Sequence, residues 1–129
     1  MKIIGTLLAI SGAFATPSGC DLPCTIDKAL SGDGQSAIEM AEESSRTQTP
    51  EIVETWYRIA AENGSAKGQL AYAKILISAS RNRQDCIRAK FWLERSYGTG
   101  EPAAAGLVAT LTAALSEPRG FESGCKSAL

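Results

Sequence analysis

The chain has no histidine anywhere in its 129 residues. This absence excludes catalysis that depends on an imidazole base, and it excludes metal sites that use histidine ligands. Aromatic residues are also scarce: tryptophan, tyrosine and phenylalanine make up 6% of the chain, while alanine is abundant. A composition with many alanines and few aromatic residues favours close-packed helices over a sheet.

Net charge is almost absent as well. Acidic and basic residues nearly balance, and the formal charge at pH 7 is −1. A chain without an excess of basic residues has no electrostatic case for binding nucleic acid or an anionic membrane surface. Its length of 129 residues and its 44% of apolar residues suit one small globular domain. The sequence predicts no cofactor and no metal ion.

The apolar run at residues 3–14 is too short to span a bilayer, which needs about 20 such residues. It follows the basic start Met1-Lys2 and ends at Ala13-Phe14-Ala15, which has the A-x-A form of a signal-peptidase site. This arrangement predicts a cleaved signal peptide over residues 1–15 and export to a bacterial periplasm or beyond it. The alternative interpretation is a buried N-terminal strand.

A second processing motif lies directly after this region. Pro17-Ser18-Gly19-Cys20 resembles a lipobox, in which Cys20 would be acylated and would anchor the chain to a membrane. Serine and glycine fit the motif, whereas proline stands where a leucine-like residue is expected. Lipidation of Cys20 would also leave Cys24 without a disulfide partner, which favours the disulfide interpretation.

Four cysteines need an interpretation: Cys20, Cys24, Cys86 and Cys125. In an oxidising compartment they predict two disulfides, with three pairings open. A helix over residues 103–115 should run antiparallel to the helix that carries Cys86 and end beside its start, so a short tail can bring Cys125 to Cys86. Cys20 then pairs with Cys24. The alternative is a metal site or a redox pair, but the chain has no Cys-x-x-Cys motif.

One stretch of the sequence returns at a fixed spacing. The segment from Trp56 to Gly64 is matched by the segment from Trp92 to Gly100, and both the tryptophans and the glycines are 36 positions apart. A period in this range is typical of stacked helical repeats. A small-residue segment follows each glycine, and a weaker copy lies upstream at residues 32–38. We therefore expect helical hairpins that bury their apolar faces against one another.

Turn residues indicate where the helices begin and end. Thr49-Pro50 predicts a helix start with threonine as the cap, and Gly64 predicts a left-handed helix end. Asp85 is expected to cap the helix that carries Trp92. Polar connections are expected over residues 45–48 and 78–84. The expected helices are a short one ending at Ser31, then residues 35–44, 50–63, 65–77, 85–97 and about 103–115.

The predicted fold is all-α: a short right-handed α/α superhelix of about five to six helices, stacked as antiparallel hairpins over residues 27–115. Residues 16–26 are expected to form a disulfide-bearing N-terminal segment, and residues 116–129 a tail. The repeat resembles the Sel-one-like repeat family, whose pattern is an aromatic pair, a basic residue, two alanines and a glycine before a small-residue helix. The residues that carry the resemblance are Trp56, Ala60, Ala61, Gly64, Ala66, Ala89, Trp92 and Gly100.

This resemblance implies a superhelix that binds other proteins, and it implies no catalytic residue. We therefore expect an exported protein-binding module whose partner is a protein of the cell envelope. The module would act either as an assembly factor or as an immunity protein that blocks a toxin. Acidic residues gather between positions 39 and 54 and basic residues between 81 and 95. One interpretation is that they form two oppositely charged surfaces that orient a partner. The alternative is that the charges are solvated helix faces and that the tyrosines are core edges. The candidate contacts are Tyr57, Tyr72, Tyr97, Arg88 and Arg95.

The rival class is an enzyme, such as the cell-wall hydrolase activity ascribed to cysteine-rich members of this family. The chain lacks histidine, a Gly-x-Ser-x-Gly elbow and a Ser-x-x-Lys motif with its partner motifs. Paired carboxylates occur as Glu42-Glu43 and as Glu51 with Glu54, but both pairs lie in highly charged stretches that are expected to be exposed. A structural protein without a partner is a third interpretation, disfavoured because a short repeat stack leaves an end uncovered.

Overall fold

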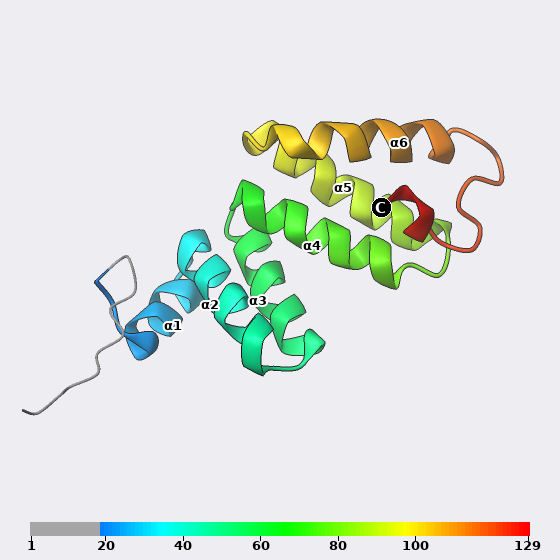
Figure 1. Ribbon diagram of the computed structural model, residues 1–129. Coiled ribbons are helices and arrows are strands. Elements are labelled where there is room, and N and C mark those ends of the chain that lie inside the picture. Colours follow the sequence, from blue (N-terminus) through cyan, green and yellow to red (C-terminus); the bar gives the residue numbers. More distant parts are fainter. Residues whose placement is uncertain (1–18) are drawn as a thin grey trace, which may run out of the picture.

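The computed structural model describes residues 19–129, and in this part of the chain all regular structure is helical. Each α-helix packs against the helices next to it in sequence, which gives a row of helices (Figure 1). The all-α class is therefore confirmed for the described residues, whereas the signal peptide and Pro17-Ser18 of the lipobox lie outside them. The helices are α1 (Leu22–Leu30), α2 (Gly34–Thr47), α3 (Pro50–Glu62), α4 (Ala66–Ala79), α5 (Arg83–Thr99) and α6 (Ala105–Leu115), with the 3-10 turns η1 (Pro102–Ala104) and η2 (Lys126–Ala128).

Two predicted connections are shorter than expected because helices continue into them. α2 runs to Thr47, and the hydroxyl of Ser45 donates a hydrogen bond of 2.6 Å to the carbonyl of Glu42 within its last turns. α4 runs to Ala79 and α5 begins at Arg83, so three residues connect them instead of the predicted seven. Polar residues in these stretches lie on exposed helix faces, which the sequence alone does not distinguish from a loop.

Three of the turns between helices are built in the same way. A glycine with positive φ follows α1, α3 and α5, a conformation that only glycine adopts without strain. The φ values are +109° at Gly32, +83° at Gly64 and +115° at Gly100. The next residue then caps the following helix through its side chain. These capping bonds run from Ser36 N to Asp33 Oδ2 (3.3 Å), from Gly68 N to Ser65 Oγ (3.0 Å) and from Ala103 N to Glu101 Oε1 (3.1 Å).

Two predicted helix caps are wrong. Thr49 occupies the N-cap position of α3, but its side chain makes no capping hydrogen bond. The carboxylate of Glu51 lies in the first turn of this helix instead. Hydrogen bonds from the backbone N–H of Glu51 and from the Thr49 hydroxyl lower the pKa of this carboxylate. The cap of α5 is Asn82 in place of Asp85. Its Oδ1 accepts a 2.9 Å hydrogen bond from the N–H of Asp85, whose carboxylate accepts one of 2.8 Å from the N–H of Arg81.

The cap of α2 makes a pH-dependent contribution to stability. Hydrogen bonds from the hydroxyl and the backbone N–H of Ser36 hold the pKa of Asp33 below its ordinary value of 3.8. Because the folded pKa is lowered, this contribution is present above pH 3.8 and is lost as the pH falls through the folded value. Asp33→Asn keeps a capping oxygen but does not titrate. We expect the wild type to lose more stability than this variant on acidification, measured by urea unfolding; parallel losses would contradict this role of Asp33.

Buried side chains form two clusters along the row of helices. The first joins α1, α2 and α3, and Trp56 packs against it from α3. The second joins α4, α5, α6 and the tail, and Trp92 packs against it from α5. Trp92 also lies edge-to-face on Tyr72 of α4, with ring centroids 5.6 Å apart. Each half-buried tryptophan thus contacts the hairpin that precedes its own helix.

α3 and α4 cross closely at Gly68, which is buried. A Cβ atom added to Gly68 would lie 2.6 Å from the Cβ of Ala60, whereas one added to Gly98 in α5 would meet nothing within 4 Å. We expect Gly68→Ala to destabilise the chain by about 1–2 kcal/mol, because overpacking exceeds the gain in helix propensity. Gly98→Ala, the matched control, should stabilise it by about 0.5–1 kcal/mol. Thermal unfolding measures both, and effects of the same sign would contradict the close crossing.

The tail after α6 folds back on the α4–α5 end of the molecule (Figure 1). The cysteine pairs at bonding distance are those that the sequence predicts, with Cα–Cα distances of 5.8 Å for Cys86–Cys125 and 5.6 Å for Cys20–Cys24. The N–H of Cys125 donates a hydrogen bond of 2.8 Å to the hydroxyl of Ser80. The Arg83 guanidinium donates to the carbonyls of Leu115, Glu117 and Gly120, so it fastens the end of α6 to α5.

Candidate protein-binding surface

One face of α5 is turned away from the rest of the described chain. Its opposite face is fully buried through Cys86, Ala89, Leu93 and Ser96. Three side chains one turn apart follow the outward face: Ile87, Phe91 and Arg95. Ile87 is 41% exposed and Phe91 is 50% exposed. We call these three residues, together with Arg88 beside them, the α5 surface.

Ring contacts connect the α5 surface to the core. The buried ring of Tyr72 supports Trp92, and the Trp92 ring in turn lies edge-to-face against Phe91 at 5.3 Å between centroids. The guanidinium of Arg95 lies 5.6 Å from the ring centroid of Phe91 and 5.9 Å from that of Trp92. Such cation–π geometry orients the charge without neutralising it. The exposed cation and ring are therefore held in place by a buried support.

The arginines of this surface have no ion-pair partner among the described residues. The four ion pairs found in residues 19–129 involve Arg46, Arg58, Lys67 and Lys90, and none involves Arg88 or Arg95. On the neighbouring flank of α5, Lys90 and Glu94 pair with each other. The α5 surface therefore combines two positive charges that are unpaired within residues 19–129, Arg88 and Arg95, with the exposed apolar pair Ile87 and Phe91.

The 36-residue spacing of the sequence does not account for this surface. The 36-residue period places Thr55 of α3 at the position equivalent to Phe91, and Glu51 at the position equivalent to Ile87. Both α3 residues are exposed and polar. The equivalent positions of α3 therefore carry polar residues, and the 36-residue spacing gives no reason for a phenylalanine at position 91.

The structure separates the predicted contact residues into different environments. Arg88, Arg95 and Tyr97 are exposed, although Tyr97 lies on the Lys90–Glu94 flank of α5. Tyr57 is half-buried in the first cluster, and burial, followed by the charge of Glu42, raises the pKa of its hydroxyl. Tyr72 is 5% exposed. It therefore offers little surface to a partner, and its ring lies edge-to-face against Trp92.

Sequence reasoning missed Ile87 and Phe91. Their spacing of four residues is an i, i+4 apolar pair, which by itself suggests a buried helix face. The buried face is instead set by the alanine, cysteine and serine side chains that let α4 approach closely. The sequence did contain one indication. α5 has two apolar stripes, and neighbouring helices can cover only one of them, so the other must be exposed.

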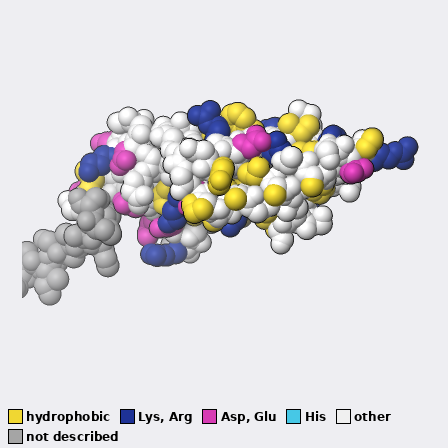
Figure 2. Space-filling view, turned by 90° about the horizontal axis from the view of Figure 1, so that it is seen from above, with side chains coloured by type: hydrophobic (Ala, Val, Ile, Leu, Met, Phe, Trp, Pro, Cys, Tyr) yellow, Lys and Arg dark blue, Asp and Glu magenta, His cyan; other side chains and the backbone are white. Residues whose placement is uncertain are grey.

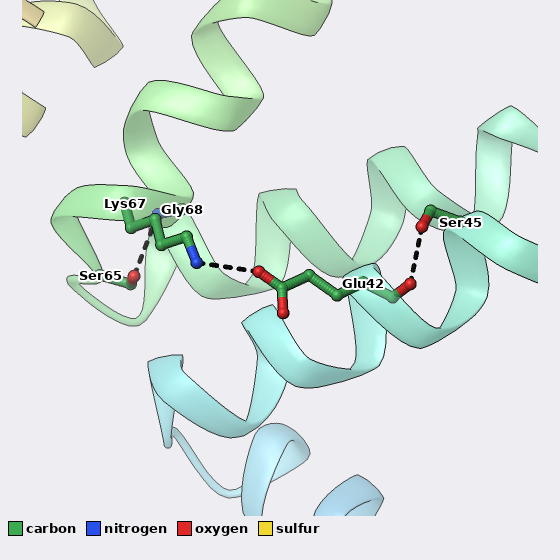
Figure 3. Close-up of polar contacts among 5 residues, drawn as sticks. All are labelled: Glu42, Ser45, Ser65, Lys67 and Gly68. Carbon is green, nitrogen blue, oxygen red and sulfur yellow. Dashed lines mark hydrogen bonds and ion pairs between the residues drawn. The ribbon is translucent and has the colours of Figure 1, made fainter. Parts of the chain in front are cut away.

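One residue of the acidic stretch, Glu42, links two helices. Lys67 at the start of α4 reaches Glu42 of α2 at 2.8 Å, beside the capping bond of Ser65 (Figure 3). This ion pair raises the pKa of Lys67, and because both side chains are about half exposed or more it contributes at most about 1 kcal/mol. The lowered pKa of Glu51 is the opposite of what a general acid needs. Within residues 19–129 no cluster of three acidic or cysteine ligands could hold a metal ion.

The α6 side of the molecule is poor in charge. α6 contains no ionisable residue, and only Leu111 in it is buried. In Figure 2, which looks at the molecule from above, hydrophobic side chains gather over the part of the chain away from the grey N-terminal residues. No helix within the described residues is both long and apolar enough to cross a membrane.

Comparison of the chain with models of known families, with curated proteins and with solved structures yields no match.

Proposed function

We propose that the chain is an exported helical-repeat module of the Sel-one-like type, which binds a protein partner through the α5 surface. The observation that carries this proposal is Phe91, a half-exposed phenylalanine at the centre of an outward helix face, in edge-to-face contact with Trp92. Aromatic and arginine side chains are the residues that most often dominate binding energy at protein interfaces.

Equivalent positions in successive units support the repeat assignment. Ala60 and Ser96, which are 36 positions apart, are both fully buried, which is what close helix crossings require. The signature alanines Ala61 and Ala89 are buried as well, although their period-equivalents are Tyr97 and Val53. The signature glycines Gly64 and Gly100 both adopt the left-handed conformation at a turn. Trp56 and Trp92 each pack toward the preceding hairpin. Stacked hairpins of this kind form a right-handed superhelix, which is the arrangement that we propose.

Two disulfide-distance cysteine pairs support an oxidising compartment. This agrees with the signal-peptide pattern at residues 1–15 and with a periplasmic or secreted location. The Cys20–Cys24 pairing also favours a protein without a lipid anchor at Cys20. In such a compartment two kinds of partner fit. The chain acts either as an assembly factor that binds an envelope protein, or as an immunity protein that binds and blocks a toxin.

Site-specific photocrosslinking in the producing cell tests the binding function. A benzophenone amino acid replaces Phe91 in one strain and Thr55, the repeat-equivalent exposed position, in the control strain. We expect a discrete adduct with a second protein after irradiation at position 91 and none at position 55. Absence of an adduct at position 91, or equal adducts at both positions, would refute the proposed surface. A one-to-one adduct with a toxin indicates the immunity role, and a larger envelope complex the assembly role.

A further inference from the structure

The α5 surface also indicates the chemistry of its partner. We infer that it binds an acidic segment of another protein, in which carboxylates flank an apolar anchor residue. This inference rests on the proposed protein-binding function and adds the class of partner to it. It is drawn from the arrangement of apolar side chains, charges and ring contacts on α5.

The apolar half of the recognition comes from Ile87 and Phe91. They lie one turn apart, are 41% and 50% exposed, and have no neighbouring helix over them in the described chain. Covering this pair removes apolar surface from water, which favours an apolar side chain in the partner. The edge-to-face contact of Phe91 with Trp92 favours this orientation of the ring, which reduces the side-chain entropy lost when the partner binds.

The charged half comes from Arg88 and Arg95. Both guanidinium groups are exposed, and neither has a carboxylate within ion-pair distance among residues 19–129. Arg95 is additionally oriented by the rings of Phe91 and Trp92. A planar guanidinium held in place is suited to paired hydrogen bonds with a carboxylate. Charge complementarity therefore selects an acidic partner segment over a basic or neutral one.

The chain's own nearby acidic residues do not serve as that partner. Glu94, the closest acidic neighbour along α5, pairs with Lys90, and Glu42 pairs with Lys67. A second copy of the chain offers acidic residues beside exposed apolar ones in α1, where Leu22 is 51% and Leu30 is 65% exposed near Asp21 and Asp27. The sedimentation measurement below distinguishes this occupant from a different protein.

Selection from a library of random displayed peptides against the full exported chain tests the inference without a known partner. We expect enriched peptides to combine Asp or Glu with Leu, Ile, Phe or Trp. Their binding should weaken at least about tenfold in Phe91→Ala and in Arg95→Glu, and should weaken further at raised salt. Arg58→Glu, an equal charge change on exposed Arg58 of α3, is the matched control and should leave binding unchanged.

Three results would overturn the inference. Enriched peptides that are basic or uncharged would refute the acidic class, and binding that is insensitive to Phe91→Ala and Arg95→Glu would refute the location. Sedimentation showing a self-associated chain that Phe91→Ala dissociates would assign the surface to a second copy. A photo-adduct at position 91 combined with non-acidic peptides would leave the protein-binding function standing while refuting the partner class, so the two failures are distinguishable.

Discussion

Removing the Cys86–Cys125 disulfide, through Cys86→Ala with Cys125→Ala, is expected to lower the free energy of unfolding by about 4 kcal/mol. The two cysteines are 39 positions apart, and the chain-entropy relation for a closed loop of this length gives that magnitude. Both residues are fully buried, so the variant also loses packing at the point where the tail meets α5. Urea unfolding of the oxidised wild type and the variant measures the difference.

The second disulfide provides the control. Cys20 and Cys24 are separated by only 4 positions, so the same relation gives about 2 kcal/mol for Cys20→Ala with Cys24→Ala. The Cys86–Cys125 variant should therefore unfold at the lower urea concentration. Two results would contradict this account: an equal loss of unfolding free energy in both variants, or no loss on removing Cys86–Cys125. Either would show that this disulfide does not stabilise the fold by holding the tail.

Leu111→Ala is expected to destabilise the chain by about 2–5 kcal/mol, the range for truncating a fully buried leucine. Leu111 is 0% exposed and is the buried residue of α6, through which that helix joins the second cluster. The cavity left behind would sit at the contact between α5 and α6. α6 should then detach first, which native-state hydrogen exchange would detect as lost protection over residues 105–115.

Thr112→Ala is the control for this prediction. Thr112 is adjacent in α6 but exposed, so its replacement should change stability by less than about 0.5 kcal/mol. If Leu111→Ala had an equally small effect, α6 would not be anchored by this side chain. The hairpin of α5 and α6 would then need a different explanation for its packing.

The features predictable from the sequence are those fixed by local chemistry. The glycines at 32, 64 and 100 need a left-handed conformation, and the 36-residue period relates Trp56 to Trp92 and Gly64 to Gly100. The cysteine pairing followed from helix direction. The caps of α3 and α5 were missed because several residues near a helix start can accept the same N–H groups, and the choice of Asn82 over Asp85 depends on where the preceding turn ends.

The proposed binding surface was only half predictable for a different reason. Arg88 and Arg95 stood out as charges, but the exposure of Ile87 and Phe91 depends on which helix covers which face of α5. The burial of Tyr72 against the Trp92 ring was not predictable either, because it is a tertiary contact without a local signal. Spacing within one helix cannot distinguish two apolar stripes until the neighbouring helices are in place.

The most direct measurement is the dissociation constant for the complex between this chain and the partner captured at position 91. It is determined for the wild type, for Phe91→Ala and for Thr55→Ala. The central claim is that the stacked hairpins leave the α5 surface as the place where a partner binds. It predicts binding at least about tenfold weaker for Phe91→Ala than for the wild type, and unchanged binding for Thr55→Ala. Equal affinity of all three proteins would contradict it.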